Sequence, residues 1–212
     1  MITVSTIIGL IVAYLFGSIP SAVWIGKIFY KIDVREYGSG NSGATNTFRV
    51  LGKRAGIAVM TVDILKGFFA TRIAFFIGDL PLESTQFINF QLSLGIAAVL
   101  GHIFPIYAGF RGGKGIATLL GMVISLHPPA AFICVIIFVT TLIITQYVSL
   151  SSILASVTFP LLTFFIYQET EPSLRIFGIA IAFLVITTHQ KNIERLWNGE
   201  ENKAHLFKRK KN

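Results

Sequence analysis

The chain has 212 residues, of which 53% are hydrophobic and only 13% are charged, whereas charged residues make up about 25% of an average soluble domain. The mean hydropathy is +0.71, and the apolar residues form blocks of roughly 16–25 residues, as in helices surrounded by lipid. This pattern excludes an ordinary soluble globular domain and predicts a polytopic membrane protein. The single cysteine, Cys134, excludes an intramolecular disulfide and a cysteine-based metal site.

The apolar blocks predict seven transmembrane helices and therefore an all-α integral membrane fold. The first block has no Lys or Arg before Lys27, so it lacks the basic start of a signal peptide and we expect it to stay in the membrane. The fourth block reaches only about 18 Å against a ~30 Å hydrocarbon core, so a re-entrant hairpin with the fifth is the alternative to two spans. The proline pair at 128–129 favours two helices joined by a turn. The seven blocks are 2–25, 56–77, 87–104, 116–126, 130–147, 150–167 and 174–188.

Lys and Arg, which accumulate in cytoplasmic loops, set the expected orientation. Of the 18 such residues, 15 fall in segments 27–54 and 111–114 and in the tail 191–211, and the other three, Lys66, Arg72 and Arg175, lie within apolar blocks. The alternate loops have no Lys or Arg but carry acidic residues: Asp79, Glu83, Glu169 and Glu171. We therefore expect the N-terminus outside and the C-terminus in the cytoplasm. This topology accounts for most of the net charge of +8, so no nucleic-acid partner is expected. With no internal repeat, low-complexity segment or soluble domain, residues 1–212 are predicted to form a single membrane-embedded domain.

Two expected cytoplasmic loops have compositions suited to binding phosphate. Residues 38–49 read GSGNSGATNTFR, in which glycines, hydroxyls and amides surround an anion readily and Arg49 offers a two-pronged phosphate donor. Residues 109–115 read GFRGGKG and immediately precede the fourth apolar block, where a helix N-terminus and Lys114 would form a phosphate cradle. This second loop is not a Walker P-loop, because Ala108 and Gly115 stand where that motif needs Gly and Ser or Thr. The alternatives are a solvated linker for the first loop and a basic helix anchor for the second.

Other polar groups lie at the expected cytoplasmic ends or within helices. On a continuing helix, His189, Asn192 and Arg195 would share one face and form a polar wall, or would simply be interfacial residues. Asp63 and Lys66 are three residues apart inside the second block, where they are expected to neutralise each other as a structural pair or a substrate contact. His102 and His127 have no ligand partners at metal-binding spacing, so no metal or other cofactor is expected.

Several motifs together resemble one known family, the bacterial membrane acyl-phosphate:glycerol-3-phosphate acyltransferases, or PlsY family. The resemblance covers the chain in order. It is carried by YLFGSIP at 14–20, SGNSGATN at 39–46 followed by Arg49, DILKG at 63–67, GHIFP at 101–105, GFRGGKGIAT at 109–118, YVSLSS at 147–152, HQKNIERL at 189–196 and GEE at 199–201.

The resemblance implies a seven-helix enzyme of the bacterial cytoplasmic (inner) membrane with its active site on the cytoplasmic face. It would transfer a fatty acyl group from acyl phosphate to the 1-hydroxyl of glycerol 3-phosphate, releasing 1-acylglycerol 3-phosphate (lysophosphatidic acid) and phosphate in the first step of phospholipid synthesis. Its partners would be these two substrates and membrane lipids, and it would act as a monomer. The expected phosphate-binding residues are Ser39, Gly40, Asn41, Thr45, Arg49, Gly112, Gly113 and Lys114, and the expected catalytic residues are Ser149, His189 and Asn192.

The proton acceptor in this reaction has two candidates. No histidine is followed five residues on by the aspartate of a His-x-x-x-x-Asp signature, so either His189 or a substrate phosphate oxygen takes the hydroxyl proton. A transporter of organic phosphate is the alternative class of function. It is disfavoured because transporter sites lie near the membrane midplane between repeats, whereas these donors gather on one face.

Overall fold

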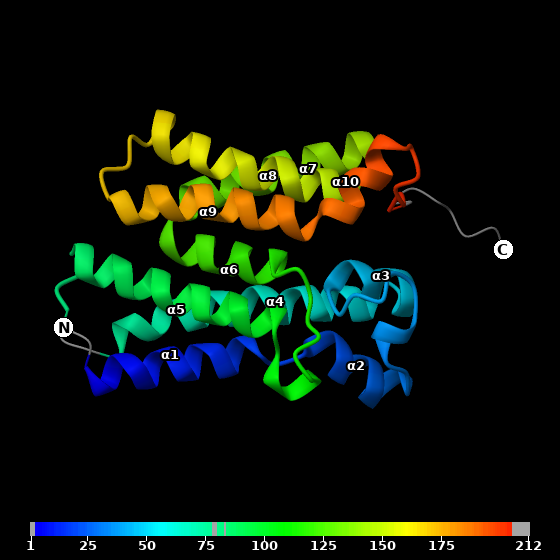
Figure 1. Ribbon diagram of the computed structural model, residues 1–212, viewed down its shortest axis with the longest axis horizontal. Helices are drawn as coiled ribbons and strands as arrows, with labels where there is room; N and C mark the ends of the chain where they lie inside the picture. Colours follow the sequence, from blue (N-terminus) through cyan, green and yellow to red (C-terminus); the bar gives the residue numbers. More distant parts are fainter. Residues whose placement is uncertain (1–2, 78–79, 83, 205–212) are drawn as a thin grey trace. The chain divides into compact units, whose positions relative to one another are not determined.

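The computed structural model describes residues 3–77, 80–82 and 84–204 (Figure 1), and within them the chain is helical with no strand. It forms two compact units, Met1–Pro128 and Pro129–Asn212. The first contains α1 (Val4–Gly17), α2 (Ser21–Tyr30), α3 (Ala44–Leu51), α4 (Lys53–Arg72), α5 (Thr85–Ile103) and α6 (Ile116–Leu126). Then come α7 (Pro128–Thr145), α8 (Val148–Leu161) with a π-helical turn at Leu162–Ile166, α9 (Pro172–Thr188) and α10 (Gln190–Trp197). The predicted outward acidic residues Asp79 and Glu83 and the basic residues 208–211 lie outside the described residues.

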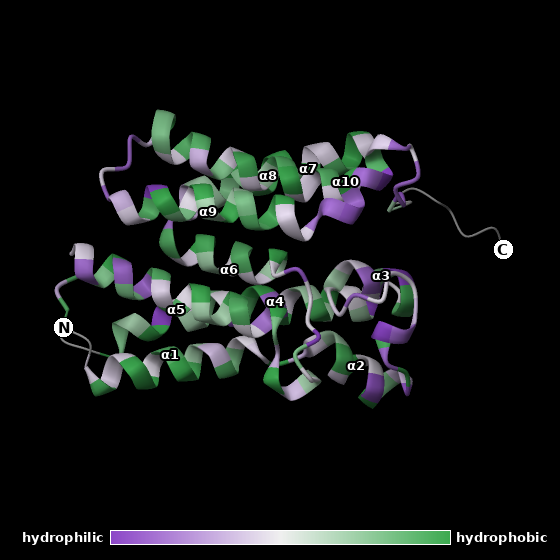
Figure 2. Ribbon diagram, viewed as in Figure 1, coloured by the Kyte–Doolittle hydropathy of each residue, from purple (hydrophilic) through white to green (hydrophobic). Residues whose placement is uncertain are grey.

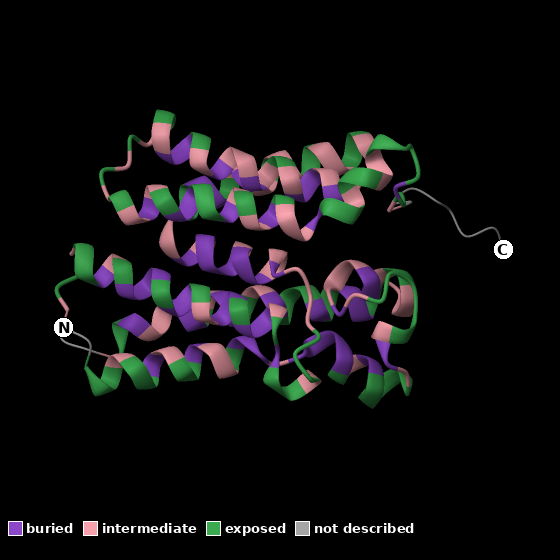
Figure 3. Cartoon of the chain, in the orientation of Figure 1, coloured by how far each residue is buried: buried purple, intermediate pink, exposed green. Residues whose placement is uncertain are grey.

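Glycines let two pairs of helices in the first unit pack backbone against backbone. A Cβ on Gly17 of α1 would collide with the main chain of Ala98 on α5, and a Cβ on Gly67 of α4 would collide with the carbonyl of Thr118 on α6. Small residues at such positions allow the close approach typical of membrane helices. Figure 3 shows buried residues along α4 and α5, which pack on each other and on α1 and α6.

The first apolar block, predicted as one helix over 2–25, is broken between α1 and α2, and the two parts meet at 41°. Pro20 explains the break, since it lacks an N–H and disfavours helical geometry in the residue before it. The carbonyl of that residue, Ile19, accepts a hydrogen bond from Lys66 Nζ of α4 (3.0 Å). The prediction of one continuous helix was therefore wrong at residues 18–20.

The buried ion pair on α4 forms hydrogen bonds with residues at this break. Lys66 Nζ lies 2.9 Å from Oδ1 of Asp63, as the predicted mutual neutralisation requires, and both side chains are almost fully buried. The same carboxylate oxygen accepts a hydrogen bond from Ser21 Oγ at the start of α2 (2.6 Å). Because these contacts join α4 to the α1–α2 break, they favour the structural interpretation of the pair.

A second bend separates α9 from α10 by 63° and corrects the expected continuous helix through His189. The His189 ring Nδ1 lies 2.8 Å from the carbonyl oxygen of Val185, the acceptor that a helical N–H at 189 would use. The N–H of His189 instead donates to Ile186 (3.1 Å). A side chain that replaces a rung of the helical ladder is a recognised cause of such kinks.

Every predicted apolar block contains a helix, and Figure 2 shows that hydrophobic residues dominate α7. In the described part of the chain, three helical stretches are long and apolar enough to cross a membrane: Thr85–Ala108, Pro128–Thr145 and Val148–Ile166. The count becomes five if each bent pair, α1 with α2 and α9 with α10, is one span. The helix α4 fails this test on its charged residues, and α6 has 11 residues. Pro128 begins α7 directly, so the predicted turn shrinks to His127 alone.

Candidate functional site: two glycine-rich loops and a carboxylate-centred cluster

Asn46 holds the first glycine-rich loop in shape. It lies in the first turns of α3 and is 2% exposed. Its Oδ1 accepts the N–H of Ser39 (2.9 Å), and its Nδ2 donates to the carbonyls of Val34 (2.8 Å) and Tyr37 (3.1 Å). Gly38 passes close to this amide with φ of 61°, a left-handed conformation that favours glycine. The loop is therefore folded around a buried amide.

The predicted phosphate ligands of this loop face away from that internal network. Ser39 is exposed, Asn41 and Thr45 are half-buried, and Arg49 is exposed in the last turn of α3. Among the described residues, none of these four side chains makes a hydrogen bond or an ion pair. Their donors are therefore available for a ligand, together with the first-turn amides of α3, which have no acceptor within the helix.

Two hydrogen bonds bring the loops of the first unit together. Nη1 of Arg35 donates to the carbonyl of Ala108 (2.8 Å), and Ser42 Oγ donates weakly to the carbonyl of Arg111 (3.5 Å). Asp33 orients Arg35 through a charged pair of 2.7 Å and is also 3.3 Å from Lys27. The hydrogen bond from Arg35 holds the pKa of Asp33 far below its usual value, so the carboxylate stays ionised at neutral pH.

The second glycine-rich loop folds back onto the end of α5. The N–H groups of Gly112 and Gly113 donate to the carbonyls of Ile103 (3.1 Å) and His102 (3.2 Å). These two amides, predicted as part of a phosphate cradle, are thus already used to shape the loop. Lys114 follows at the entrance to α6, whose first amides have no acceptor in the helix. The loop therefore offers a lysine and a helix N-terminus to an anion.

In the second unit, Ser149, Asn192 and Arg195 all donate hydrogen bonds to the carboxylate of Glu201. Its Oε1 accepts hydrogen bonds from Ser149 Oγ (3.0 Å) and Asn192 Nδ2 (2.7 Å), and its Oε2 accepts one from Arg195 Nε (2.8 Å). The Glu201 side chain is 3% exposed. Burial alone raises the pKa of Glu201, but the hydrogen bonds from Arg195, Asn192 and Ser149 outweigh it and hold the pKa below its usual value. The polar wall predicted on α10 is therefore organised around a carboxylate.

His189 is buried at the bend between α9 and α10, with 4% of its surface exposed. Since the carbonyl of Val185 can only accept, the contact with Nδ1 places a proton on that nitrogen. In the neutral ring, Nε2 is then the nitrogen that can accept a proton.

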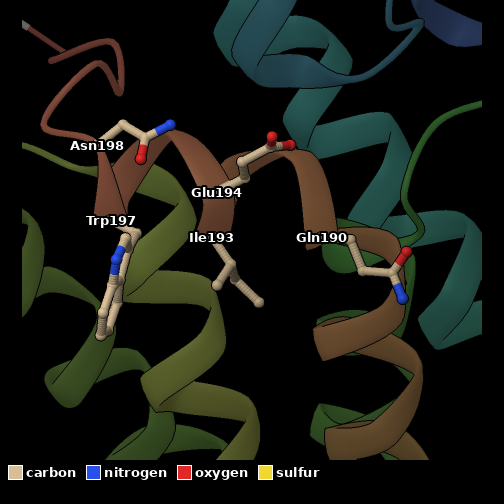
Figure 4. A pocket seen from close by; sticks show the side chains of 5 residues that line it. All are labelled: Gln190, Ile193, Glu194, Trp197 and Asn198. Carbon is tan, nitrogen blue, oxygen red and sulfur yellow. The ribbon is translucent and has the colours of Figure 1, made fainter.

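The opposite face of α10 carries none of the predicted catalytic residues and combines two large apolar side chains with three polar ones. Figure 4 shows the side chains that line a shallow pocket of about 340 Å³ there: Gln190, Ile193, Glu194, Trp197 and Asn198. Trp197 is 90% exposed, as is common for tryptophan where a helix meets lipid headgroups. The predicted polar residues Asn192 and Arg195 instead contact Glu201.

A sequence model of the glycerol-3-phosphate acyltransferase family matches residues 7–199. The chain belongs to this family. It is 46% identical over 205 residues to a glycerol-3-phosphate acyltransferase of Enterococcus faecalis, covering 93% of this chain and 91% of that protein. It is 46% identical over 201 residues to the Listeria welshimeri enzyme (95% and 98% covered) and 40% identical over 218 residues to that of Chlorobaculum tepidum (92% and 94%).

Solved structures of a glycerol-3-phosphate acyltransferase have the same fold. The crystal structure of PlsY (YgiH), an integral membrane glycerol 3-phosphate acyltransferase in its glycerol 3-phosphate form, matches with a TM-score of 0.85 and 36% identity over 96% of this chain and 100% of that one. Its lysophosphatidic acid form matches with a TM-score of 0.80 and 36% identity, over 94% and 95% of the two chains. The chain is thus a PlsY-family integral membrane acyltransferase, and the family implies a role in phospholipid synthesis.

Four residues of this acyltransferase that organise the candidate site were not predicted to belong to it: Asn46, Arg35, His102 and Glu201. Glu201 and Asn46 stand inside motifs that carry the family resemblance, but sequence spacing does not show that they bind other loops. The signals that point to them are an acidic residue in a basic tail and an amide three residues after the last glycine of the GSGNSG run.

Proposed function

We propose that this acyltransferase moves a fatty acyl group from acyl phosphate to the 1-hydroxyl of glycerol 3-phosphate, releasing lysophosphatidic acid and inorganic phosphate. One observation carries the proposal. Two glycine-rich loops, each with a cation, are tied together in the first unit by Arg35 and Ser42, and the Arg49 guanidinium has no hydrogen bond or ion pair among the described residues. Such a set of donors suits a site that binds phosphate groups.

The proposed reaction brings two phosphorylated anions together, so it needs positive charge and N–H donors to offset their repulsion. Arg49 and Lys114 supply the charge, and Ser39, Asn41 and Thr45 supply side-chain donors. Gly40 lets the main chain approach the phosphates because it carries no side chain. Gly112 and Gly113, which were also expected to bind phosphate, let the second loop fold closely onto α5 in front of Lys114. No cofactor is needed, since acyl phosphate is an activated anhydride with a good leaving group.

In the proposed transfer step, the hydroxyl oxygen of glycerol 3-phosphate attacks the acyl carbon, and the bond from that carbon to the phosphate oxygen breaks. His189 Nε2 accepts the hydroxyl proton, since Nδ1 is held by the Val185 carbonyl. The substrate phosphate is the alternative acceptor. We assign Ser149 and Asn192 a catalytic role as well, and Glu201 orients both of their side chains.

The decisive experiment supplies purified full-length protein with acyl phosphate and glycerol 3-phosphate and follows phosphate release and lysophosphatidic acid. Acyl-CoA and acyl carrier protein are the control donors. We expect stoichiometric phosphate and lysophosphatidic acid with acyl phosphate alone. Transfer from the control donors but not from acyl phosphate would refute the proposed donor, and no transfer from any donor would refute the activity.

The proton acceptor is tested separately with His189→Gln and His189→Ala. If His189 is the base, both variants lose most turnover, and the wild-type rate falls at low pH as the ring becomes protonated. Near-normal turnover with a flat pH profile in either variant would assign the proton to the substrate phosphate. Binding of glycerol 3-phosphate to each variant shows whether the site is still folded.

We also propose that the chain acts as a monomer and a single domain in the bacterial cytoplasmic membrane, with seven spans, an external N-terminus and both loops in the cytoplasm. Labelling of introduced cysteines by a membrane-impermeant maleimide, in a Cys134→Ser background, tests the topology. Gln168→Cys and His127→Cys are expected to react from outside, and Tyr37→Cys only after permeabilisation. If only His127→Cys is not labelled from outside, α6 and α7 form a re-entrant hairpin instead of two spans.

A further inference from the structure

His102 lies between a buried carboxylate and the second glycine-rich loop. It occupies the last turn of α5 and is 6% exposed. Its Nδ1 is 3.7 Å from Oδ1 of Asp63, and its main-chain carbonyl accepts the N–H of Gly113. Asp63 is itself held by Lys66 and Ser21. One side of the imidazole therefore packs against the buried Asp63–Lys66 ion pair.

The other ring nitrogen of His102 faces Gly113. A Cβ added at Gly113 would collide with Nε2, and the three atoms nearest to that Cβ all belong to the imidazole ring of His102. Gly113 is not one of the glycines with positive φ. The histidine side chain, and not the backbone conformation, thus prevents a larger residue at 113.

Gly112 beside it is restricted for a different reason. A Cβ at Gly112 would collide with the carbonyl oxygens of His102 and Ile103. These are main-chain atoms, so no side-chain change at position 102 removes them. Loss of the His102 ring should therefore relieve the cost of a larger residue at position 113 but not at position 112.

We propose that His102 is a positioning residue that spaces the Gly113–Lys114 segment from the buried Asp63–Lys66 pair and so sets where Lys114 meets a substrate phosphate. The inference rests on the proposed phosphate-binding function of this loop. His102 acts through the loop, because Asp63 and Gly113 occupy the two sides of its ring that carry nitrogen.

A double-mutant cycle tests this contact on the purified full-length protein. Affinities for glycerol 3-phosphate and for inorganic phosphate are measured by calorimetry in the wild type, Gly113→Ala, His102→Ala and the double variant. We expect Gly113→Ala to weaken the affinity for at least one probe by about 10-fold or more in the wild type, but by about 3-fold or less once the ring is gone. In turnover assays KM should rise far more than kcat falls.

Gly112→Ala is the matched control, and it should cost the same with or without the His102 ring. His102→Gln, which keeps a polar side chain of similar reach, should retain more affinity than His102→Ala. Three results would each overturn the inference. The first is additive effects of Gly113→Ala and His102→Ala, and the second is an equal rescue of Gly112→Ala by His102→Ala. The third is an unchanged affinity of Gly113→Ala for both glycerol 3-phosphate and inorganic phosphate. The binding measurements need no acyl donor, so they fail or succeed independently of whether acyl phosphate is the donor in turnover.

Discussion

Glu201→Gln is the substitution that most directly tests the carboxylate-centred cluster. The glutamine keeps the shape of the side chain but has one carbonyl oxygen in place of two carboxylate oxygens. If that oxygen serves Ser149 and Asn192, the new amide NH₂ faces the Nε–H of Arg195, where two donors meet. The variant therefore loses one charge-assisted hydrogen bond and the charge itself.

The expected cost follows from these contacts. A hydrogen bond to a charged group contributes about 1.5–3 kcal/mol, and Glu201→Gln should destabilise the second unit by about that amount. Arg195 is 37% exposed, so its share lies at the lower end of that range. Glu201→Ala removes all three bonds and leaves buried donors unpaired, which should cost roughly 3–5 kcal/mol.

Unfolding of the detergent-solubilised protein, followed by circular dichroism, measures these differences. The neighbouring Glu200→Gln is the matched control, because it removes the same charge from an exposed side chain and should change stability by less than about 0.5 kcal/mol. Turnover should fall with Glu201→Gln but not with Glu200→Gln. Equal stability and turnover in the two variants would refute the role of Glu201.

The pH dependence gives a second, independent check on Glu201. Its pKa is below the usual value of 4.5 in the folded protein, so the folded state binds fewer protons there than the unfolded state. The stabilisation is therefore complete at neutral pH and is lost as the pH falls below about 4.5 through the folded pKa. The stability gap between wild type and Glu201→Gln should shrink over that window, and a gap that widens on acidification would contradict the assignment.

Three further substitutions test other parts of the molecule. Asn46→Ala removes all three hydrogen bonds that shape the first loop and should cost about 2–4 kcal/mol and weaken glycerol 3-phosphate binding, as unfolding and calorimetry would show. Lys66→Met leaves the Asp63 carboxylate buried without a countercharge and should cost about 3–5 kcal/mol in thermal unfolding, most of it recovered when Asp63→Asn is added. Asp33→Asn releases Arg35; because Arg35 holds the pKa of Asp33 below its usual 3.8, the wild type should lose its advantage over this variant only as the pH falls below about 3.8.

The positions of most helices could be predicted from hydropathy, because a lipid-facing helix carries its signal in consecutive residues. The fourth block and α6 share the same bounds, 116–126. The breaks at 18–20 and at His189 were not predicted, since each depends on an acceptor taken by a distant or unexpected group: Ile19 by Lys66, and Val185 by the His189 ring. Local composition contains no information about such competition.

The candidate site, like the fold, could be predicted from the sequence only in part. Glycine, hydroxyl and cationic residues at helix ends could be predicted as candidate phosphate ligands from the sequence alone. Their support could not, because Arg35 reaches Ala108 across 73 residues and Ser149 reaches Glu201 across 52. A buried carboxylate in a basic tail looks like a solvated charge until its three donors are located.

The two glycines before Lys114 show why residue type alone is a poor guide to role. Composition suggested that Gly112 and Gly113 bind phosphate through their N–H groups, but both groups are bonded to carbonyls of α5. What the glycines provide is space: one lies against main-chain oxygens and the other against the His102 ring. Because the loop packs this closely on α5, it loses little conformational entropy when an anion binds. Lys114 and the first amides of α6 are therefore already oriented before the anion arrives.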